Sequence, residues 1–405
     1  MDATPGAADA MPLAWCRSDF DPFSPDLATR LQPTLDRMRA QCPVTHSAAH
    51  DGFWVVTGYE DVLTVAQDWQ TYSSAHGLNV VPAPVTIRNL PVQADPPEQR
   101  IFKRLITPFF TPSAVAAWEA PTRALVNRLI DDFAAAGECD FMAAFARPFP
   151  ARAFFELAID APAGDLDDVV HLASRSSTPN APDAGECWRG LAVWIRRFVA
   201  SRRDQPARGD VVDAVIHADI DGRPITEDEI VGTIQLLILG GLETTAGTLG
   251  QLLARWCAEP EIPAVLRRRP QDLGRAVEEM LRMDGSFIAV ARTAMRDHVL
   301  GGQPISAGDK VLVYWAGANF DGAEFADPHH FDLDRPRNRH MAFGIGPHRC
   351  AGSNLARLNL RIAVEELLRR LDDIALAPGA EVDYHSTLTR SPLTLPITFR
   401  PIVEG

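Results

Sequence analysis

Residues 343–352, FGIGPHRCAG, bring together the residue types that a metal-bound sulfur requires. Cys350 stands just before a run with helical spacing, and the free amide N–H groups at a helix start favour negative charge. A thiolate at Cys350 would be stabilised there and free to bind a metal. Gly344, Gly346 and Gly352 permit tight turns and close approach of a flat ligand, and Phe343 can shield the sulfur from water. A lone cysteine is usually a buried structural residue, but its fixed spacing from Phe343, Gly346 and Gly352 favours a ligand.

A second polar group interrupts an apolar stretch, LLILGGLETTAG, at residues 236–247. Gly240, Gly241, Glu243 and Thr244 are unusual inside a helix, and local rule-breaking of this kind often marks function. Glycine pairs and hydroxyls that bond to the preceding turn can open a helix and make room for a small ligand or water. A carboxylate and a hydroxyl alongside would then relay protons. Close packing of two helices selects the same residue types, so this segment alone leaves both interpretations open.

The elements that must position these residues are mostly helices. Thr226 and Glu229 form a capping box, and the periodic pattern after them runs to about Ala258, before Pro260. At 1.5 Å per residue this helix is about 50 Å long. Helical spacing also dominates residues 97–270 and recurs at 27–41, 59–69 and 354–371. The pattern predicts strands at 52–57 and after residue 296, a hairpin at 387–399, and a proline-rich loop at 78–94.

Composition narrows the class of protein. The 405 residues, 46% of them apolar, suffice for a large core. A net charge of −14, from 39 basic and 53 acidic side chains, argues against a nucleic-acid or anionic-membrane partner. The six cysteines are scattered with no CxxC pair, which favours a reducing cytoplasm, and the first residues show neither a signal peptide nor a membrane anchor. We expect a mainly α cytoplasmic protein with small β-sheets, forming one domain over residues 1–405 with an irregular segment at 1–20.

The cysteine segment matches F-x-x-G-x-x-x-C-x-G, the haem-binding signature of the cytochrome P450 family, and GGLET resembles that family's oxygen-binding motif, [AG]-G-x-[DE]-T. The resemblance extends over nearly the whole chain. It implies the cytochrome P450 fold, a single haem-containing domain around the long central helix. It also implies haem b (iron protoporphyrin IX) as the cofactor, Cys350 as the axial ligand of the iron, and Glu243 and Thr244 as the residues that deliver protons to dioxygen.

The resemblance assigns further residues around the cofactor. Arg292 and His348 match partners of the haem propionates. Gln99 and Lys103, in DPPEQRIFKR, occupy positions that contact a propionate, where many relatives have histidine and arginine. Arginine can form two parallel hydrogen bonds with a carboxylate, whereas lysine offers a single ammonium charge, so the chain departs from the family pattern at Lys103. The other cofactor-binding residues expected are Phe343, Gly344, Gly352, Gly240 and Gly241.

Glu279 and Arg282, in EEMLR, are three residues apart on a predicted helix, where such a pair is usually a weak surface contact. In the family, this motif is buried and joins an arginine that Arg335 of FDLDRP matches. The resemblance therefore implies a structural triad with no part in catalysis.

Among bacterial members, the segments DPPEQR, GGLET and RPITEDE resemble the camphor monooxygenase branch most closely. Matching this branch predicts an apolar pocket with one hydroxyl, and therefore a small hydrophobic substrate, terpenoid-like or aromatic. An anionic substrate would need a fixed cation, for which Arg88 and Arg390 are the candidates, and we expect both to be exposed. The predicted pocket residues are Ile87, Leu236, Leu239, Ile288, Val290, Leu388 and Thr389.

The activity implied is that of a haem-thiolate monooxygenase, which consumes O2 and two electrons. The chain has no flavin or iron–sulfur motif, so we expect the electrons to come from a [2Fe–2S] ferredoxin and its NAD(P)H-dependent reductase. A basic patch would attract an acidic ferredoxin. Two alternatives stay open: a peroxygenase, whose members usually lack the acid–alcohol pair, and a non-catalytic haem sensor. The patch would comprise Arg104, His348, Arg349, Arg357 and Arg361.

Overall fold

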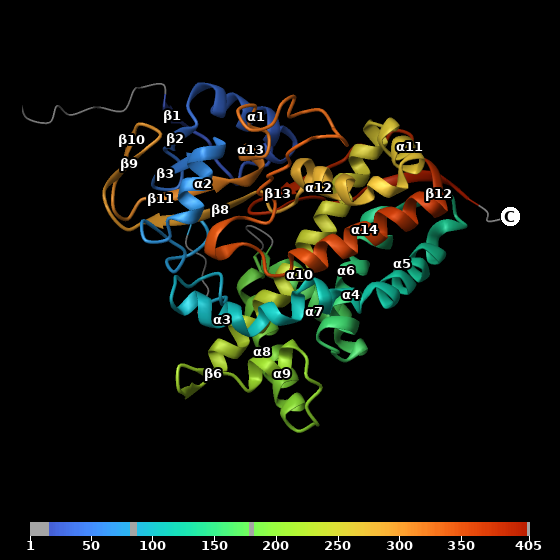
Figure 1. The fold of residues 1–405 in the computed structure, drawn as a ribbon, viewed down its shortest axis with the longest axis horizontal. Helices are drawn as coiled ribbons and strands as arrows, with labels where there is room; N and C mark the ends of the chain where they lie inside the picture. Colours follow the sequence, from blue (N-terminus) through green and yellow to red (C-terminus); the bar gives the residue numbers. More distant parts are fainter. Residues whose placement is uncertain (1–15, 82–86, 178–181, 403–405) are drawn as a thin grey trace, which may run out of the picture.

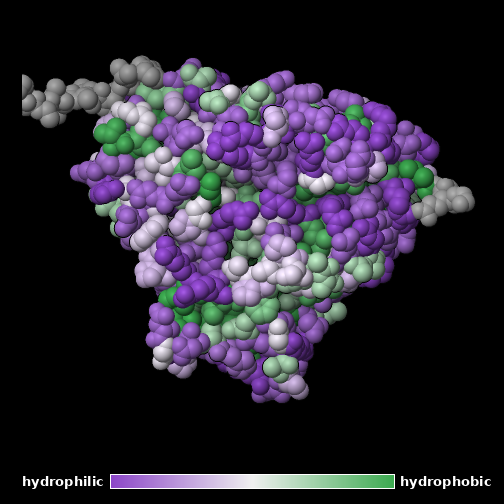
Figure 2. Space-filling view, in the orientation of Figure 1, coloured by the Kyte–Doolittle hydropathy of each residue, from purple (hydrophilic) through white to green (hydrophobic). Residues whose placement is uncertain are grey.

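A computed structural model of the protein describes residues 16–81, 87–177 and 182–402. Helices make up most of the fold, and many of the strands lie on the left of Figure 1, whereas β12 (Leu371–Leu376) lies on the right and β6 (Asp219–Ile220) at the bottom. The expected irregular amino-terminal segment lies largely outside the described residues. The face drawn in Figure 2 is mostly hydrophilic, and a band of less polar residues crosses it over α3, α4 and α7.

The central element is α10 (Glu227–Ala258), which begins where the sequence predicts it. The Thr226 hydroxyl accepts from the Glu229 N–H, and the Glu229 carboxylate accepts from the Thr226 N–H at 2.8 Å, completing the capping box. By length and composition α10 is the one helix of the described chain apolar enough to cross a membrane. However, 61% of its most apolar window is buried within the fold, as expected of a core helix.

The other helices pack around α10 in two groups. On one side, α5, α12 and α14 enclose the largest apolar core, and on the other α6, α7, α8 and α9 form a second core. The flanking α-helices are α1 (Leu27–Gln41), α2 (Tyr59–Gln67), α3 (Glu98–Ile106), α4 (Pro112–Ala116), α5 (Glu119–Ala134), α6 (Pro148–Ala153), α7 (Leu166–Ser177), α8 (Ala184–Arg203), α9 (Val211–Ile216), α11 (Glu261–Arg268), α12 (Leu273–Asp284), α13 (Trp315–Ala318) and α14 (Ser353–Arg370).

The largest sheet has six strands in the order β1-β2-β3-β11-β8-β4. It brings the early strand β3 beside the late strand β11 in parallel, and β11 pairs antiparallel with β8. The bounds are β1 (Arg17–Ser18), β2 (Val44–Ser47), β3 (Phe53–Val56), β4 (Tyr72–Ser73), β8 (Ala289–Ala294) and β11 (Lys310–Tyr314). The smaller sheets contain β5 (Glu138–Asp140), β6 (Asp219–Ile220), β7 (Arg223–Pro224), β9 (His298–Leu300), β10 (Gln303–Ile305), β12 (Leu371–Leu376), β13 (Tyr384–Ser386), β14 (Arg390–Pro392) and β15 (Pro396–Pro401).

One local expectation is wrong, and one cysteine pairing was not expected. Residues 387–399 do not form a hairpin, because β14 pairs back with β13 while β15 joins β12 and β5. This arrangement buries Ile397 and Phe399 in the large core. Cys16 and Cys42 are joined by a disulfide, although their separation of 26 residues gives no sign of it. Folding of the β1–β2 region brings their Cα atoms to 5.7 Å, which suits a disulfide.

Candidate active site

One cavity lies between α10 and residues 343–352, which we call the cysteine loop. The cavity has a volume of about 300 Å³, and its walls are mostly apolar. Gly240 and Thr244 line it from α10, and Phe343, Gly344 and Cys350 line it from the cysteine loop. The two segments that the sequence marked as chemical therefore face the same space.

The backbone of the cysteine loop depends on its glycines. Gly344 and Gly346 have φ angles of +62° and +73°, which side-chain-bearing residues rarely adopt. A Cβ on Gly346 would also lie 2.5 Å from the carbonyl oxygen of Ala66 at the end of α2. The Cys350 N–H donates to the Phe343 carbonyl at 2.9 Å, which closes the loop three residues before α14 begins.

Cys350 is accessible from the cavity, while protein surrounds its sulfur on the other sides. Burial raises the pKa of the thiol, and the Gly352 N–H and the positive charge of Lys103 act in the opposite direction. Arg357 lies over the Phe343 ring, 4.6 Å from its centre, and fixes that ring beside the loop. The sulfur thus faces the cavity.

Thr244 is held against the preceding turn of α10. Its hydroxyl donates to the Gly240 carbonyl at 2.8 Å, and its own carbonyl accepts from the hydroxyls of Thr248 and Ser286. A Cβ on Gly240 would meet nothing within 4 Å, whereas one on Gly241 would lie 3.0 Å from the Phe154 ring. Gly240 thus keeps the cavity wall open. The hydroxyl bond to the preceding turn is therefore present as expected, while α10 stays helical throughout.

Glu243 does not line this cavity. It faces a second cavity, of about 340 Å³, together with Arg147, Ser174 and His385. Burial raises the pKa of Glu243, while a hydrogen bond with Ser174 and the charge of Arg147 lower it. Consecutive helix residues point about 100° apart, so the expectation of a carboxylate alongside the Thr244 hydroxyl is wrong: the two side chains reach different spaces.

Basic and donor groups converge on one edge of the first cavity. Arg292, on β8, is fully buried, and burial lowers the pKa of its guanidinium to about 10. It donates to the Ala291 carbonyl at 2.9 Å, and the charge of Asp95 partly offsets the effect of burial on its pKa, although Arg292 forms no salt bridge within the described residues. Burial, with Arg292 and Lys103 nearby, lowers the pKa of His348 to about 3, so its imidazole is neutral near pH 7.

Lys103 and Gln99 reach the same edge from α3. The Lys103 ammonium donates to the carbonyls of Pro347 and Arg349 at 2.7 and 2.8 Å, and the Gln99 amide donates to Pro347 at 2.7 Å. Both side chains also line the cavity. A buried cation that forms no salt bridge is costly, and Asp95 offsets only part of the burial of Arg292, so this edge is complementary to an anionic ligand.

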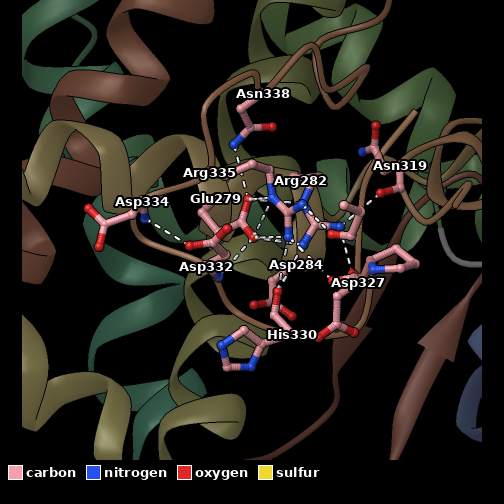
Figure 3. A network of polar contacts seen from close by, with 12 residues as sticks. Glu279, Arg282, Asp284, Asn319, Asp327, His330, Asp332, Asp334, Arg335 and Asn338 are labelled. Atoms are coloured by element: carbon pink, nitrogen blue, oxygen red, sulfur yellow. Dashed lines mark hydrogen bonds and ion pairs between the residues drawn. The ribbon is translucent and has the colours of Figure 1, made fainter. Parts of the chain in front are cut away.

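Glu279, Arg282 and Arg335 meet in one buried network (Figure 3). Arg282 donates to both Glu279 oxygens, at 2.9 and 2.7 Å, and Arg335 donates to both at 3.1 Å. Arg282 also donates to the backbone carbonyls of Asn319 and Pro328. The network joins α12 to the chain segment that leads into the cysteine loop.

Only part of the predicted pocket lies at the cavity. Leu236 and Val290 line it, whereas the other five predicted residues do not. Ile288 packs into the core that holds α1, on another side of the sheet, and Phe287 takes the cavity position. The backbone bridge between Phe287 and Thr389 sets this geometry, which strand alternation does not predict. The predicted residues outside the cavity lining are Ile87, Leu239, Ile288, Leu388 and Thr389.

Two charge expectations change. Arg88 is exposed as expected and paired with Glu98, but Arg390 is largely buried and stacked 3.6 Å above the Tyr384 ring, away from the first cavity. The basic patch is smaller than predicted, because Glu278 binds Arg357 and His348 lies inside the cavity. Arg361 pairs with Glu119 at 2.9 Å.

Known proteins share this architecture. The family profile "Cytochrome P450" matches residues 273–383. The chain is 31% identical to "Cytochrome P450 monooxygenase PikC" of Streptomyces venezuelae, over 94% of each protein. It superimposes on cytochrome P450 CYP101C1 with a TM-score of 0.88 and 27% identity, over 96% of this chain and 98% of that one. The Mycobacterium marinum cytochrome P450 CYP268A2, solved with pseudoionone, gives a TM-score of 0.84 and 27% identity, over 92% and 95%.

The cavity fits the cofactor that these proteins share. A planar, largely apolar ring with two carboxylates matches the apolar walls and the buried, unpaired Arg292, and a thiol faces the same space. The cavity, the fold and the identity over nearly the full length of PikC lead to one conclusion: this chain belongs to the cytochrome P450 family of haem-dependent monooxygenases.

Proposed function

We propose that this enzyme hydroxylates a small hydrophobic substrate, terpenoid-like or aromatic, with O2 and two electrons from a [2Fe–2S] ferredoxin. The observation that carries the substrate class is the apolar distal wall formed by Leu236, Phe287 and Val290. Arg292 and Lys103 lie at the donor edge, so the apolar wall itself offers no fixed charge to an anionic substrate. The pseudoionone bound by CYP268A2 is a ligand of the same general kind.

Within this proposal, Cys350 ligates the haem iron. Arg292, His348, Lys103 and Gln99 hold the propionates, and Gly240, Gly241, Phe343, Gly344 and Gly352 shape the walls of the haem site. When bound, the haem supplies the iron centre at which dioxygen is reduced and split. The protein's own contributions are position, exclusion of water and the supply of protons.

The arrangement of Thr244 and Glu243 suggests how protons are supplied. The Thr244 hydroxyl lies on the cavity wall, and Glu243 lies one residue earlier in a separate polar cavity with Arg147 and His385. Burial raises the pKa of Glu243, which brings its protonated form closer to neutral pH. We propose that Thr244 presents protons at the haem side of α10 and that Glu243 takes up protons from the polar cavity, from which they must pass around α10 to reach Thr244.

Thr244→Ala should uncouple oxygen consumption from substrate oxidation. Without the hydroxyl, protons are not positioned in the cavity, and peroxide escapes before the O–O bond is split. Oxygen consumption should stay within about threefold of wild type, while the product formed per NAD(P)H falls by about tenfold or more. The measurement compares product and hydrogen peroxide in the same assay.

Thr244→Ser is the matched control, because it keeps the hydroxyl that donates to the Gly240 carbonyl. It should remain largely coupled. A fully coupled Thr244→Ala enzyme would remove Thr244 from the proton path.

Arg292→Leu should weaken haem retention without weakening the apoprotein. The unpaired guanidinium is fully buried, so its removal relieves a cost in the apoprotein and loses a charge-assisted partner in the holoenzyme. A loss of about 1.5–3 kcal/mol corresponds to haem transfer to apomyoglobin that is faster by about 10- to 150-fold. Equal transfer rates would show that Arg292 does not hold a propionate.

The proposed ferredoxin site lies near α3 and the cysteine loop. Arg104 and Arg349 are exposed there, and within the described chain neither has an acid in salt-bridge distance. The exposed Pro108, Pro112 and Ala116 lie in the segments that follow α3. An acidic ferredoxin would be attracted to this surface, and turnover should fall as salt screens the charges.

The test of the proposed function is an optical titration of the ferric enzyme with monoterpenoids, ionone-like ketones, small aromatics and carboxylic acids. A low- to high-spin shift of the Soret band with the neutral hydrophobic compounds, followed by ferredoxin-dependent hydroxylation of the same compounds, would support the proposal. A shift with carboxylic acids alone would overturn the substrate class. Oxidation driven only by hydrogen peroxide would favour a peroxygenase.

A further inference from the structure

The loop before α3 rests directly on α10 at Gly232. A Cβ built on Gly232 would lie 2.0 Å from the carbonyl oxygen of Arg88 and 3.4 Å from the Ile87 side chain. The first of these atoms belongs to the backbone and cannot swing aside as the end of a side chain can. Gly232 lies within a regular helix, where the backbone conformation does not require glycine. Its lack of a side chain therefore serves the close approach of the loop.

Polar contacts hold the same loop on both sides of this point. The amide of Gln235, one turn from Gly232, donates to the Asn89 side chain at 3.4 Å, and Gln235 is buried. The Asn89 N–H donates to the Gln93 side chain at 2.7 Å, and the Gln93 N–H donates to the Asn89 carbonyl at 2.8 Å. Arg88 forms two hydrogen bonds with Glu98 in the first turn of α3.

This contact lies at the end of the haem cavity. Pro91 and Val92, a few residues after the Gly232 contact, line the cavity. On α10, Leu236, Gly240 and Thr244 line it at successive turns, and Gly232 is the next turn in the same row. The row from Thr244 to Leu236 spans eight residues, or about 12 Å.

We propose that Gly232 is a specificity-determining residue. Because Gly232 has no side chain, the Arg88 carbonyl packs directly against the backbone of α10. This contact holds Pro91 and Val92 in place as the far wall of the cavity. A side chain at position 232 lifts the loop and moves that wall outward. The enzyme as it stands therefore selects compact hydrophobic substrates over elongated ones, a conclusion that rests on the proposed function for the chemical class of substrate.

The test compares wild type with Gly232→Ala in the haem-loaded enzyme. Hydrogen–deuterium exchange reports on the loop through the amides of residues 88–93. Spin-state titrations with geraniol, farnesol and geranylgeraniol report on the length of substrate that fits. We expect faster exchange in this loop, and an affinity for farnesol relative to geraniol that rises by about tenfold or more. Tenfold corresponds to about 1.4 kcal/mol, the size of a modest packing change.

Gly274→Ala is the matched control, because Gly274 is also a helical glycine and a Cβ there would meet nothing within 4 Å. It should keep wild-type loop exchange and wild-type order of affinities. If Gly232→Ala fails to take up haem, Asn89→Ala decides the question, since it removes the Gln235 contact without adding volume. Asn89→Ala should shift both readouts in the same direction by a smaller amount.

The proposal would be overturned if Gly232→Ala showed both the wild-type exchange rate in the loop and the wild-type order of affinities. If Gly232→Ala does not take up haem, the same pair of results in Asn89→Ala would overturn it. If no terpenoid shifts the spin state in any variant, the proposed substrate class fails. Loop exchange then decides the inference about Gly232, because it needs no ligand. The two failures are therefore distinguishable.

Discussion

Cys350→Ser should abolish the thiolate-ligated haem and reduce substrate oxidation by more than about 1000-fold. Cys350 is the cysteine that faces the haem cavity among the described residues, and the loop that carries it is closed by its own N–H bond to Phe343. A serine hydroxyl is a much weaker electron donor to iron than a thiolate, and thiolate donation favours cleavage of the O–O bond. The measurement is the Soret band of the reduced carbon monoxide complex.

Cys139→Ser is the control for general effects of losing a thiol. Cys139 lies on β5 and is partly exposed, far from the cavity lining. Its variant should keep the red-shifted carbon monoxide band and the activity of wild type. A Cys350→Ser enzyme that retained the same red-shifted band would exclude Cys350 as the ligand.

Glu279→Ala should destabilise the fold by about 3–5 kcal/mol, because it leaves two arginines in the interior without their counter-acid. Arg282 is almost fully buried and Arg335 is 9% exposed, and both donate to the Glu279 carboxylate. The cost in free energy exceeds that of one lost ion pair, because both guanidinium groups stay buried without a carboxylate to pair with. The measurement is the midpoint of urea unfolding of the holoenzyme, with haem release followed in parallel.

Glu324→Ala is the matched control. Glu324 also makes a two-point contact with an arginine, Arg339, but that arginine is largely exposed. Exposed pairs contribute about 0–1 kcal/mol, so this variant should unfold close to wild type. If both variants lose the same small amount, the buried network is not a major source of stability.

The same network predicts how stability changes with pH. Burial alone would raise the pKa of Glu279, but the hydrogen bonds and charge of Arg282, the Asp332 N–H and the charge of Arg335 together outweigh burial and hold that pKa below its usual value. A carboxylate with a lowered folded-state pKa stabilises the protein above its unfolded pKa, near 4.5, and this stability is lost as pH falls toward the folded value. Unfolding below pH 4.5 should therefore depend less steeply on pH in Glu279→Ala than in wild type.

Local patterns in the sequence predicted the features that local interactions stabilise. The helix start at Thr226 follows from a capping box within four residues, and the bounds of α1 follow from helical spacing. The cysteine loop is recognisable because its turns need glycine at fixed positions, as the φ angles of Gly344 and Gly346 show. Motif resemblance extended this to the haem cofactor and the fold, which the profile and the solved structures confirm.

Contacts between residues far apart in the chain account for what the sequence missed. Phe287 replaces Ile288 at the cavity because a backbone bridge to Thr389 sets the local geometry. The basic patch shrinks because α12 brings Glu278 to Arg357, 79 residues away. Such pairings depend on how helices and strands pack, and single-segment periodicity carries no record of a distant partner.

The sequence by itself determined the family, the cofactor and the long central helix, and it supplied the prediction of which residues carry the chemistry. Only the tertiary structure decided which way each of these side chains faces: Thr244 toward the haem cavity, Glu243 toward a second cavity, and Gly232 against the Arg88 carbonyl. The physical reason is that residue type and spacing set local backbone geometry, whereas cavities and close approaches exist only once elements distant in the chain have packed together.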